Sequence, residues 1–307
     1  MIKLILLTGF LGTGKTTLMK SLLKAFKEEK IGVIVNEFGE VNIDAVLMKQ
    51  DGIEMAELSN GSIFCACIKD YFLDSLVEMS KQDISYLFIE ASGLADPANM
   101  QQILNTIDAD TQRTYDYLGS ICVVDAETFL DLYDLLPALH HQIEYSNTVI
   151  INKADLVDEN RIAEVSNQIS EVNEEAQQCV TSFCKVDIKD LVKDLKPVLK
   201  EAKESTNTRE NRPKSFVLKS VEPVSKTQLQ ELLEKLAPSA YRIKGFAMTD
   251  AGIVEVSAVK EHIYIMPWDN NAFKPELEIV VISSVGIRMM SLITEAISGS
   301  IKGSILL

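Results

Sequence analysis

Residues 9–17 read Gly-Phe-Leu-Gly-Thr-Gly-Lys-Thr-Thr and fit the phosphate-loop pattern Gly-x-x-x-x-Gly-Lys-[Ser/Thr]. An apolar run, Lys3–Thr8, precedes this loop and an amphipathic stretch, Lys15–Glu29, follows it, which is the strand–loop–helix context that the motif requires. In such a loop, backbone N–H groups surround the phosphates, the lysine neutralises the β- and γ-phosphate oxygens, and the next hydroxyl binds Mg²⁺. We therefore predict a phosphate site made of Gly9, Gly12, Thr13, Gly14, Lys15, Thr16 and Thr17. Within it, Lys15 is also predicted to be catalytic and Thr16 to bind Mg²⁺.

Apolar and amphipathic runs continue to alternate through the first two-thirds of the chain. Strands this apolar, separated by helices, predict an α/β fold of the P-loop NTPase type, with a mostly parallel sheet covered on both faces. Right-handed crossovers then place the loops that follow the strands along one edge, where α/β proteins bind ligands. The predicted strands are Lys3–Thr8, Gly32–Asn36, Tyr86–Glu90, Ser120–Asp125 and Thr148–Asn152, and the predicted helices are Lys15–Glu29, Asp70–Lys81, Pro97–Ile107, Thr128–Tyr145 and Glu159–Val172.

A second motif, Asn152-Lys153-Ala154-Asp155, stands at the end of the last predicted strand and fits Asn-Lys-x-Asp. A carboxylate here can accept hydrogen bonds from both the ring N–H and the exocyclic amine of guanine, a pair that adenine does not offer. The asparagine orders neighbouring loops, and the lysine stem covers one face of the base. The motif therefore predicts Asn152, Lys153 and Asp155 as the base site, with GTP and GDP as the nucleotides. It would have no role in a kinase.

The strand Tyr86–Glu90 ends in Glu90-Ala91-Ser92-Gly93. A carboxylate at this point can hold the Mg²⁺ shell, and the Gly93 amide can sense a γ-phosphate, so Glu90 and Gly93 join the predicted catalytic residues. Leu94 follows, where Ras-type proteins place a glutamine that orients water. Because leucine cannot position a water molecule, the sequence predicts a GTPase whose intrinsic hydrolysis to GDP and phosphate is slow and needs a partner or a dimer.

Two further features suggest a transition-metal site. Glu37 lies in Asn-Glu-Phe-Gly-Glu after the second predicted strand, where GTPases carry switch loops, so its position can change with nucleotide state. Cys65 and Cys67 are two residues apart, and in an extended loop such cysteines project to the same side and can bind one soft cation. Buried thiols or a redox pair would fit the same spacing.

The polar stretch Lys203–Pro213 has no apolar periodicity and is predicted to be a linker. We expect a P-loop domain at 1–203, a linker at 204–212 and a smaller C-terminal α+β domain at 213–307. In that last part, predicted strands outnumber predicted helices, which favours a ferredoxin-like arrangement.

The chain carries a net charge of −15, with −16 in residues 1–210 and +1 in residues 211–307. Sustained contact with the phosphate backbone of nucleic acid or with an anionic membrane is therefore not expected. No stretch reaches 18 consecutive apolar residues, which argues against a transmembrane helix. The five cysteines are few and odd in number, which fits reduced thiols in a cytoplasmic protein.

The order and spacing of five segments resemble those of the CobW-type metallochaperone GTPases, relatives of the nickel-delivery GTPases UreG and HypB. The segments are GFLGTGKTT, NEFGEVNID, ELSNG, IEASGLADP and INKAD, and YRIKGF resembles the family's C-terminal domain. The resemblance implies a cytoplasmic GTPase that binds a transition metal, Zn²⁺ or Co²⁺, at Cys-x-Cys-Cys just after Asn-Gly. It also implies that nucleotide state governs capture of the metal and its release to a client.

This sequence departs from that pattern at the cysteines. Aligned without gaps from Asn60-Gly61, the family's three cysteines fall on Ser62, Phe64 and Cys65, and Cys67 adds a thiol two positions further on. Three outcomes stay open: a rearranged two-thiolate site completed by Glu37, a changed affinity and metal preference, or loss of metal binding.

Two functions follow from these alternatives. The first is a GTP-gated metallochaperone that delivers its metal to a client metalloenzyme or corrinoid protein. The second is a metal-free, GTP-driven activator of such a partner enzyme. Since relatives pair through their nucleotide faces, a GTP-dependent homodimer is consistent with either function.

Overall fold

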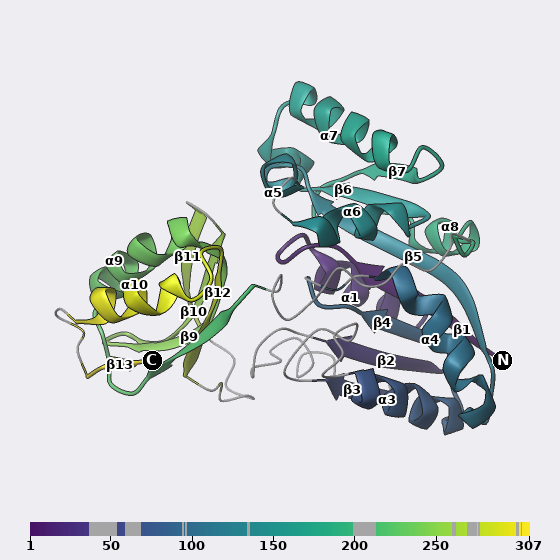
Figure 1. The fold of residues 1–307 in the computed structure, drawn as a ribbon, viewed down its shortest axis with the longest axis horizontal. Coiled ribbons are helices and arrows are strands. Elements are labelled where there is room, and N and C mark those ends of the chain that lie inside the picture. Colours follow the sequence, from purple (N-terminus) through teal and green to yellow (C-terminus); the bar gives the residue numbers. More distant parts are fainter. Residues whose placement is uncertain are drawn as a thin grey trace. The chain divides into compact units, whose positions relative to one another are not determined.

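The computed structural model describes residues 1–36, 54–58, 69–93, 95, 97–133, 136–198, 213–259, 262–268, 275, 277–298, 301 and 303–307. The chain divides into two units, Met1–Asn211 and Arg212–Leu307, and each unit has its own sheet (Figure 1). Residues 204–212, the predicted linker, lie outside the described residues.

The first unit alternates strands and helices, including short 3₁₀ helices labelled η. Its elements are β1 (Ile2–Thr8), α1 (Lys15–Ala25), β2 (Ile31–Asn36), β3 (Glu54–Leu58), α3 (Lys69–Lys81), β4 (Tyr86–Glu90), η1 (Pro97–Asn99), α4 (Met100–Ile107), η2 (Asp108–Asp110), β5 (Tyr115–Asp125), α5 (Phe129–Tyr133), α6 (Pro137–Glu144), β6 (Thr148–Asn152), η3 (Ala154–Leu156), α7 (Glu159–Val172), β7 (Gln177–Val180) and α8 (Ile188–Lys193).

Within the described residues, these strands form a seven-stranded sheet in the order β3-β2-β4-β1-β5-β6-β7, and every pairing is parallel. The predicted parallel α/β fold is therefore confirmed. The registers pair Leu7 with Glu90 and Asp125 with Asn152, so the carboxyl ends of β4, β1, β5 and β6 meet at one edge. The phosphate loop and the Asn-Lys-x-Asp motif are both at this edge.

Alternate residues of β1 are buried against different helices. Leu4 and Leu6 belong to a core with residues of α3 and α4, whereas Ile5 and Leu7 belong to a core with residues of α1 and α8. Side chains of successive strand residues point to opposite faces of a sheet, so β1 is covered on both sides. This explains why β1 is a continuous apolar run rather than an alternating one.

Three strand predictions need correction. The edge strand β3 was not predicted. The sequence also indicates a strand between Cys179 and Cys184, but the edge strand β7 is Gln177–Val180 instead. Both edge strands contain few residues of high strand propensity. Propensity is a weak guide at sheet edges, where pairing with the neighbouring strand determines the conformation. Strand β5 begins at Tyr115, five residues before the predicted Ser120, because Gly119 lies at a shift in register against β1 rather than ending the strand.

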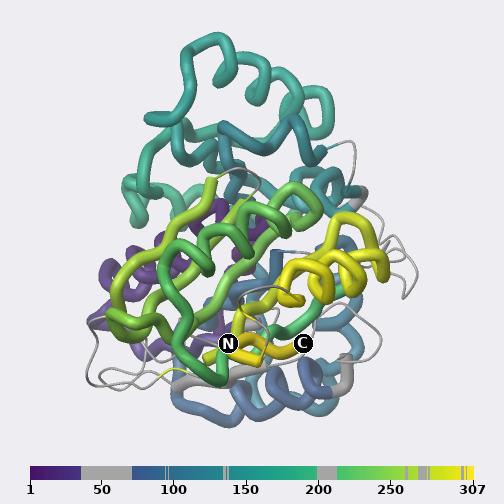
Figure 2. The backbone as a smooth tube through the Cα atoms, turned by 90° about the vertical axis from the view of Figure 1, so that its left-hand side faces the viewer, coloured from purple at the N-terminus to yellow at the C-terminus, as the bar shows by residue number. Residues whose placement is uncertain are grey.

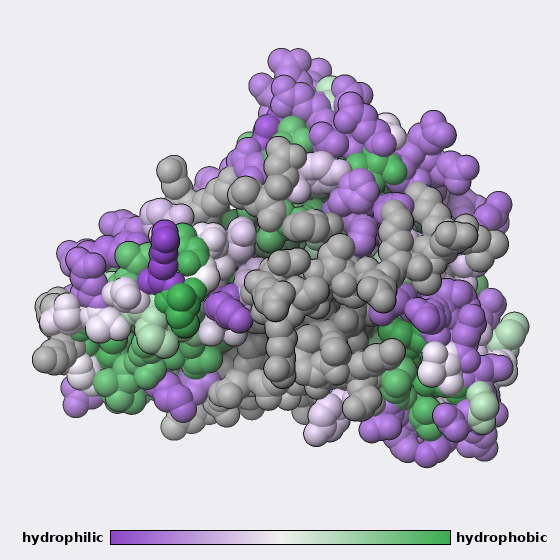
Figure 3. Space-filling view, viewed as in Figure 1, coloured by the Kyte–Doolittle hydropathy of each residue, from purple (hydrophilic) through white to green (hydrophobic). Residues whose placement is uncertain are grey.

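The predicted helix Thr128–Tyr145 is two helices, α5 and α6. Pro137 has no backbone N–H and disfavours a helical conformation at the residue before it, so it begins α6 instead of continuing α5. Helix α1 is four residues shorter than predicted, ending at Ala25, and α8 was not predicted. Helix α7 has the predicted bounds, with Asp158 capping its first turn, and Figure 3 shows a hydrophilic surface over this helix.

The second unit has the order β-α-β-β-β-β-α-β. Its elements are β8 (Ser215–Ser220), α9 (Lys226–Leu236), η4 (Ala237–Ser239), β9 (Ala240–Thr249), β10 (Gly252–Val259), β11 (His262–Pro267), β12 (Glu278–Ser283), α10 (Arg288–Ile297) and β13 (Ile305–Leu306). The strands form an antiparallel sheet in the order β11-β10-β9-β12-β8-β13. Without β10 and β11 this is the β-α-β-β-α-β order of the ferredoxin-like fold, as predicted.

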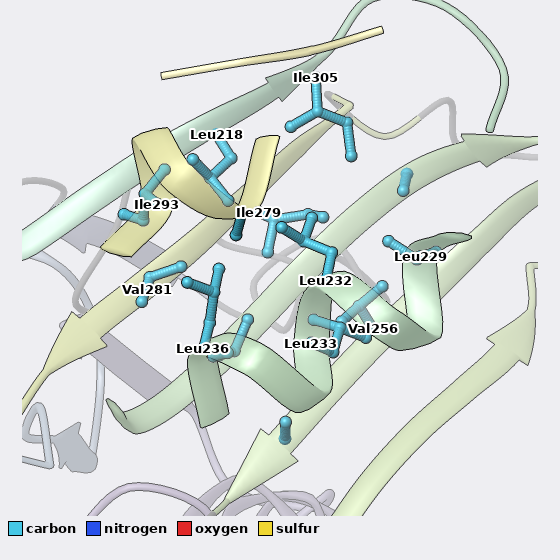
Figure 4. Packing of buried hydrophobic residues seen from close by; sticks show 14 of the residues in the cluster. Leu218, Leu229, Leu232, Leu233, Leu236, Val256, Ile279, Val281, Ile293 and Ile305 are labelled. Carbon is cyan, nitrogen blue, oxygen red and sulfur yellow. The ribbon is translucent and has the colours of Figure 1, made fainter. Parts of the chain in front are cut away.

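Helices α9 and α10 lie side by side on this sheet (Figure 2). Their apolar faces, including Leu229, Leu232, Leu233 and Ile293, pack on strand residues such as Ile279 (Figure 4). Ser225 begins α9 with a capping box, its side chain accepting from the Gln228 N–H and the Gln228 side chain accepting in return. Strand β13 was not predicted, because two residues are too few to show an alternating apolar pattern.

No helix in the described ranges is long and apolar enough to cross a membrane.

Candidate nucleotide-binding site

The phosphate loop lies between β1 and α1, as the motif predicts. Gly9 has φ 127° and its α-carbon lies so close to Val123 that an added β-carbon would collide with the Val123 carbonyl oxygen, so only glycine fits here. The Lys15 side chain, 7% exposed, folds back over the loop, where its Nζ donates to the carbonyl oxygens of Gly9 and Phe10, both at 2.9 Å. The Lys15 amine is thus held over the backbone of the phosphate loop.

Thr16, in the first turn of α1, and Glu90, at the end of β4, are brought together. The Thr16 hydroxyl donates to Glu90 Oε1 at 2.9 Å, and Glu90 is 2% exposed at the end of β4. A hydroxyl and a carboxylate beside a phosphate loop are oxygen donors of the kind that Mg²⁺ prefers. The donor set therefore fits the predicted magnesium site.

Asn152 connects the base motif to the phosphate loop. Its Nδ2 donates to the Thr13 carbonyl at 2.7 Å, and its Oδ1 accepts from the Cys184 N–H at 2.9 Å. One buried amide thus fixes two loops relative to each other, which is the ordering role that the sequence predicts for this residue. Gly12, Gly14 and Thr17 complete the loop and the first turn of α1.

Lys153 and Asp155, the two remaining residues of the predicted base site, follow directly after the end of β6. Lys153 adopts φ 62°, and its Nζ forms an ion pair with Asp125 Oδ2 at 2.6 Å. Asp155 has an exposed side chain, and its backbone N–H donates to Ser182 Oγ at 3.1 Å. The carboxylate is therefore accessible to a ligand, while the backbone beneath it is fixed.

The loop after β7, residues 181–184, also contacts the site and was not predicted from the sequence. Ser182 contacts Asp155, Cys184 contacts Asn152, and Phe183 between them is 67% exposed. Phe183 and Cys184 both have positive φ, a strained conformation for side chains larger than glycine's. Asp125, which holds Lys153, was missed as well. The sequence signal that could have indicated the loop is Ser182, in a short polar stretch that follows a strand downstream of Asn-Lys-x-Asp.

Two thiols near the site are poorly suited to bind metal. Burial raises the pKa of the Cys122 thiol to about 12, although the Thr8 hydroxyl and the Lys15 charge oppose this shift. Burial also raises the pKa of the Cys184 thiol to about 12, opposed by Lys153. Because the thiolate is the metal-binding form, both residues stay protonated at neutral pH and act as packing residues.

These raised pKa values predict a loss of stability in alkali. Above the unfolded thiol pKa of 9.0, the unfolded chain releases a proton that folded Cys122 retains, so the free energy of unfolding falls until pH reaches about 12. Each thiol contributes a slope of about 1.4 kcal/mol per pH unit in this window. We expect Cys122→Ala to be less stable than wild type at pH 8. Its free energy of unfolding, measured in urea, should fall less than that of wild type as the pH rises. Parallel pH profiles would contradict this.

The candidate transition-metal ligands Glu37, Cys65 and Cys67 lie outside the described residues, as does Leu94. Among the residues that the structure describes, no group of three or more histidine, cysteine, aspartate or glutamate side chains is placed to hold a metal ion.

The fold and the site together define a P-loop nucleotide-binding protein with an Asn-Lys-x-Asp base motif. A family model described as the CobW/HypB/UreG nucleotide-binding domain matches residues 3–180, and a model of the cobalamin synthesis protein CobW C-terminal domain matches residues 214–295. The chain belongs to the CobW/HypB/UreG family, which confirms the resemblance drawn from its motifs.

Curated relatives cover much of the chain. The zinc-regulated GTPase metalloprotein activator 1 of Dictyostelium discoideum is 29% identical over 78% of this chain and 62% of its own length. The zinc chaperone YjiA of Escherichia coli is 30% identical over 80% of this chain and 81% of its own. A crystal structure of Zn(II)-bound YjiA GTPase matches 97% of this chain and 98% of its own at 24% identity, with a TM-score of 0.46.

Proposed function

We propose that this protein is a GTPase that couples its nucleotide state to transition-metal binding and to delivery of the metal to a client protein. The observation that carries the proposal is the single sheet edge where the phosphate loop, Glu90 and Asn-Lys-x-Asp meet, connected by the Asn152–Thr13 and Thr16–Glu90 hydrogen bonds. Relatives named zinc chaperones and a GTPase metalloprotein activator support the coupling to metal.

In this proposal the residues act in distinct ways on GTP. The loop amides and Lys15 hold the β- and γ-phosphates, and Asp155 accepts from guanine while the Lys153 stem covers one face of the base. Thr16 and Glu90 would hold Mg²⁺, which would supply positive charge against the negative charge that develops during phosphoryl transfer. Gly93 senses the γ-phosphate.

The metal is cargo, and its proposed ligands are Glu37, Cys65 and Cys67. Thiolates prefer soft or borderline cations, so we propose Zn²⁺ or Co²⁺. GTP closes the segment that carries Glu37, and hydrolysis loosens the site so that the metal passes to its client. Since Ser62 and Phe64 stand where the family carries cysteines, a metal-free GTP-driven activator is the second candidate.

Cobalt titration distinguishes these two functions. We expect a thiolate-to-cobalt absorption band on adding Co²⁺ to the reduced protein with Mg²⁺, with an affinity that differs between GDP and a non-hydrolysable GTP analogue. Coupling is reciprocal, so Co²⁺ should shift the ratio of nucleotide affinities by the same factor. Cys65→Ser/Cys67→Ser should lose the band, whereas the matched variant Cys122→Ser/Cys184→Ser should keep it. Absence of a band in both nucleotide states would favour the metal-free activator.

The client is proposed to be a metalloenzyme or a corrinoid protein in the cytoplasm, and a homodimer is proposed to form with GTP. Neither nucleic acid nor a membrane is proposed as a partner, in keeping with the charge of −15. Sedimentation of the protein with GDP and with the GTP analogue tests the dimer, since a single unchanged monomer peak would exclude it.

A further inference from the structure

A buried glutamine outside the motifs bridges the turn that contains Gly93. Gln142 belongs to α6 and is 1% exposed. Its Nε2 donates to the Gly93 carbonyl at 3.2 Å and to the Ala95 carbonyl at 2.8 Å. A side-chain amide has two N–H donors, so both are used on this one stretch of backbone.

The turn held in this way lies directly against the phosphate loop. A β-carbon added to Gly93 would be 2.5 Å from the backbone nitrogen of Leu11 and 2.6 Å from its side chain, so Gly93 and Leu11 are in close contact. Gln142 also lines a small cavity together with Phe10 and Thr13 of the same loop. The glutamine therefore lies between α6, the phosphate loop and the residues that follow β4.

The hydrogen bonds fix the direction of the Gly93 N–H. The Ala95 N–H donates to the Ser92 carbonyl at 2.9 Å, and this carbonyl belongs to the same peptide group as the Gly93 N–H. In a trans peptide these two groups point in opposite directions, so holding the oxygen also sets the N–H. Gln142 in turn holds Ala95 and the next carbonyl along, that of Gly93 itself. Rotation of the Gly93 amide would break these contacts.

We propose that Gln142 is a positioning residue that presets the Gly93 amide for the γ-phosphate and so gives the site its preference for GTP over GDP. This inference rests on the proposed function, since it assigns a role within the same nucleotide site. A donor that is already oriented binds the γ-phosphate without the free-energy cost of being ordered first. Because GDP lacks the γ-phosphate, this gain applies to GTP alone. Gln142 acts on the Gly93 amide through the backbone carbonyls that it holds.

Asn173, the residue that ends α7, provides a matched control because its side-chain amide holds the carboxyl-terminal end of α6. It is also a buried amide, and its Nδ2 donates to the carbonyls of Ile143 at 3.0 Å and Ser146 at 2.8 Å. Removing either amide leaves backbone carbonyls of the same unit without their donors and lowers stability. Of these two side-chain amides, Gln142 contacts the turn beside the phosphate loop and Asn173 contacts the residues that follow Gln142.

The test measures dissociation constants for fluorescent GDP and for a fluorescent non-hydrolysable GTP analogue with Mg²⁺, together with thermal unfolding. Gln142→Met removes two neutral hydrogen bonds. We therefore expect it to weaken binding of the GTP analogue about tenfold or more and binding of GDP by less than about threefold. Asn173→Leu should lower Tm and leave the ratio of the two constants unchanged. If Gln142→Met does not fold, Gln142→Asn, whose amide is one methylene shorter, is measured with the same expected direction.

The outcomes separate the inference from the function on which it rests. An unchanged GTP-analogue to GDP ratio in a folded Gln142 variant overturns the inference while the nucleotide site stands. Equal changes of that ratio in the Gln142 and Asn173 variants also overturn it, because they would reflect general loosening of α6. If wild-type protein binds neither nucleotide, the proposed function fails, and the inference fails with it.

Discussion

Replacing Lys15 by alanine should abolish measurable GTP hydrolysis and weaken GTP binding by about 10²–10⁴-fold. Lys15 is a buried residue, 7% exposed, and its amine is held over the phosphate loop by the Gly9 and Phe10 carbonyls. Hydrogen bonds to charged groups contribute about 1.5–3 kcal/mol each, so losing two phosphate contacts accounts for the expected range. For wild type we expect turnover near the intrinsic Ras scale of about 10⁻⁴ s⁻¹, measured as phosphate release in single-turnover assays.

Lys20→Ala is the matched control for this experiment, because Lys20 is an exposed lysine on the same helix α1. It should bind and hydrolyse GTP like wild type. Wild-type turnover in the Lys15→Ala variant would show that the phosphate loop is not the catalytic site. Turnover of the isolated wild-type monomer far above the Ras scale would contradict the role assigned to Leu94.

Local sequence patterns predicted the central part of the sheet well, for a physical reason. Strands β1, β4 and β6 are almost entirely buried, so each contains a continuous apolar run that is easy to recognise. The phosphate loop and Asn-Lys-x-Asp each need several residue types at fixed short spacings, and both stand where the predicted strands end. The topology then brings their neighbours together, as in the contact between Asn152 and Thr13.

Features that depend on contacts distant in sequence were not predictable in this way. The ion pair between Lys153 and Asp125 joins residues 28 apart, and the hydrogen bond from Gln142 to Gly93 joins residues 49 apart. Nothing around Gln142 distinguishes it locally from other polar residues of an amphipathic helix. The edge strands β3 and β7 were missed or misplaced for a related reason, since pairing with a neighbour rather than composition makes them strands.

Replacing Asp155 by asparagine should change base preference from guanine to xanthine. Guanine presents two donors, its ring N–H and its exocyclic amine, and the Asp155 carboxylate can accept from both. An asparagine keeps one acceptor but presents an N–H₂ group to the exocyclic amine, so donor faces donor. Xanthine carries a carbonyl oxygen in place of that amine and restores the pair. We expect GTP affinity to fall by about 10²–10³-fold and XTP to bind within about tenfold of wild-type GTP.

The structure makes this a change of recognition rather than of folding. The Asp155 side chain is exposed, and its loop is fixed by the backbone N–H that donates to Ser182 Oγ, a contact that the substitution leaves in place. Asp158→Asn is the control: it lies three residues further on, and asparagine caps a helix as well as the aspartate that caps α7. Competition of GTP, XTP and ATP against a fluorescent nucleotide measures all three preferences. Lower affinity for GTP without higher affinity for XTP would mean that Asp155 supports the loop but does not contact the base. Equal affinity of wild type for GTP and ATP would show that the site does not recognise guanine.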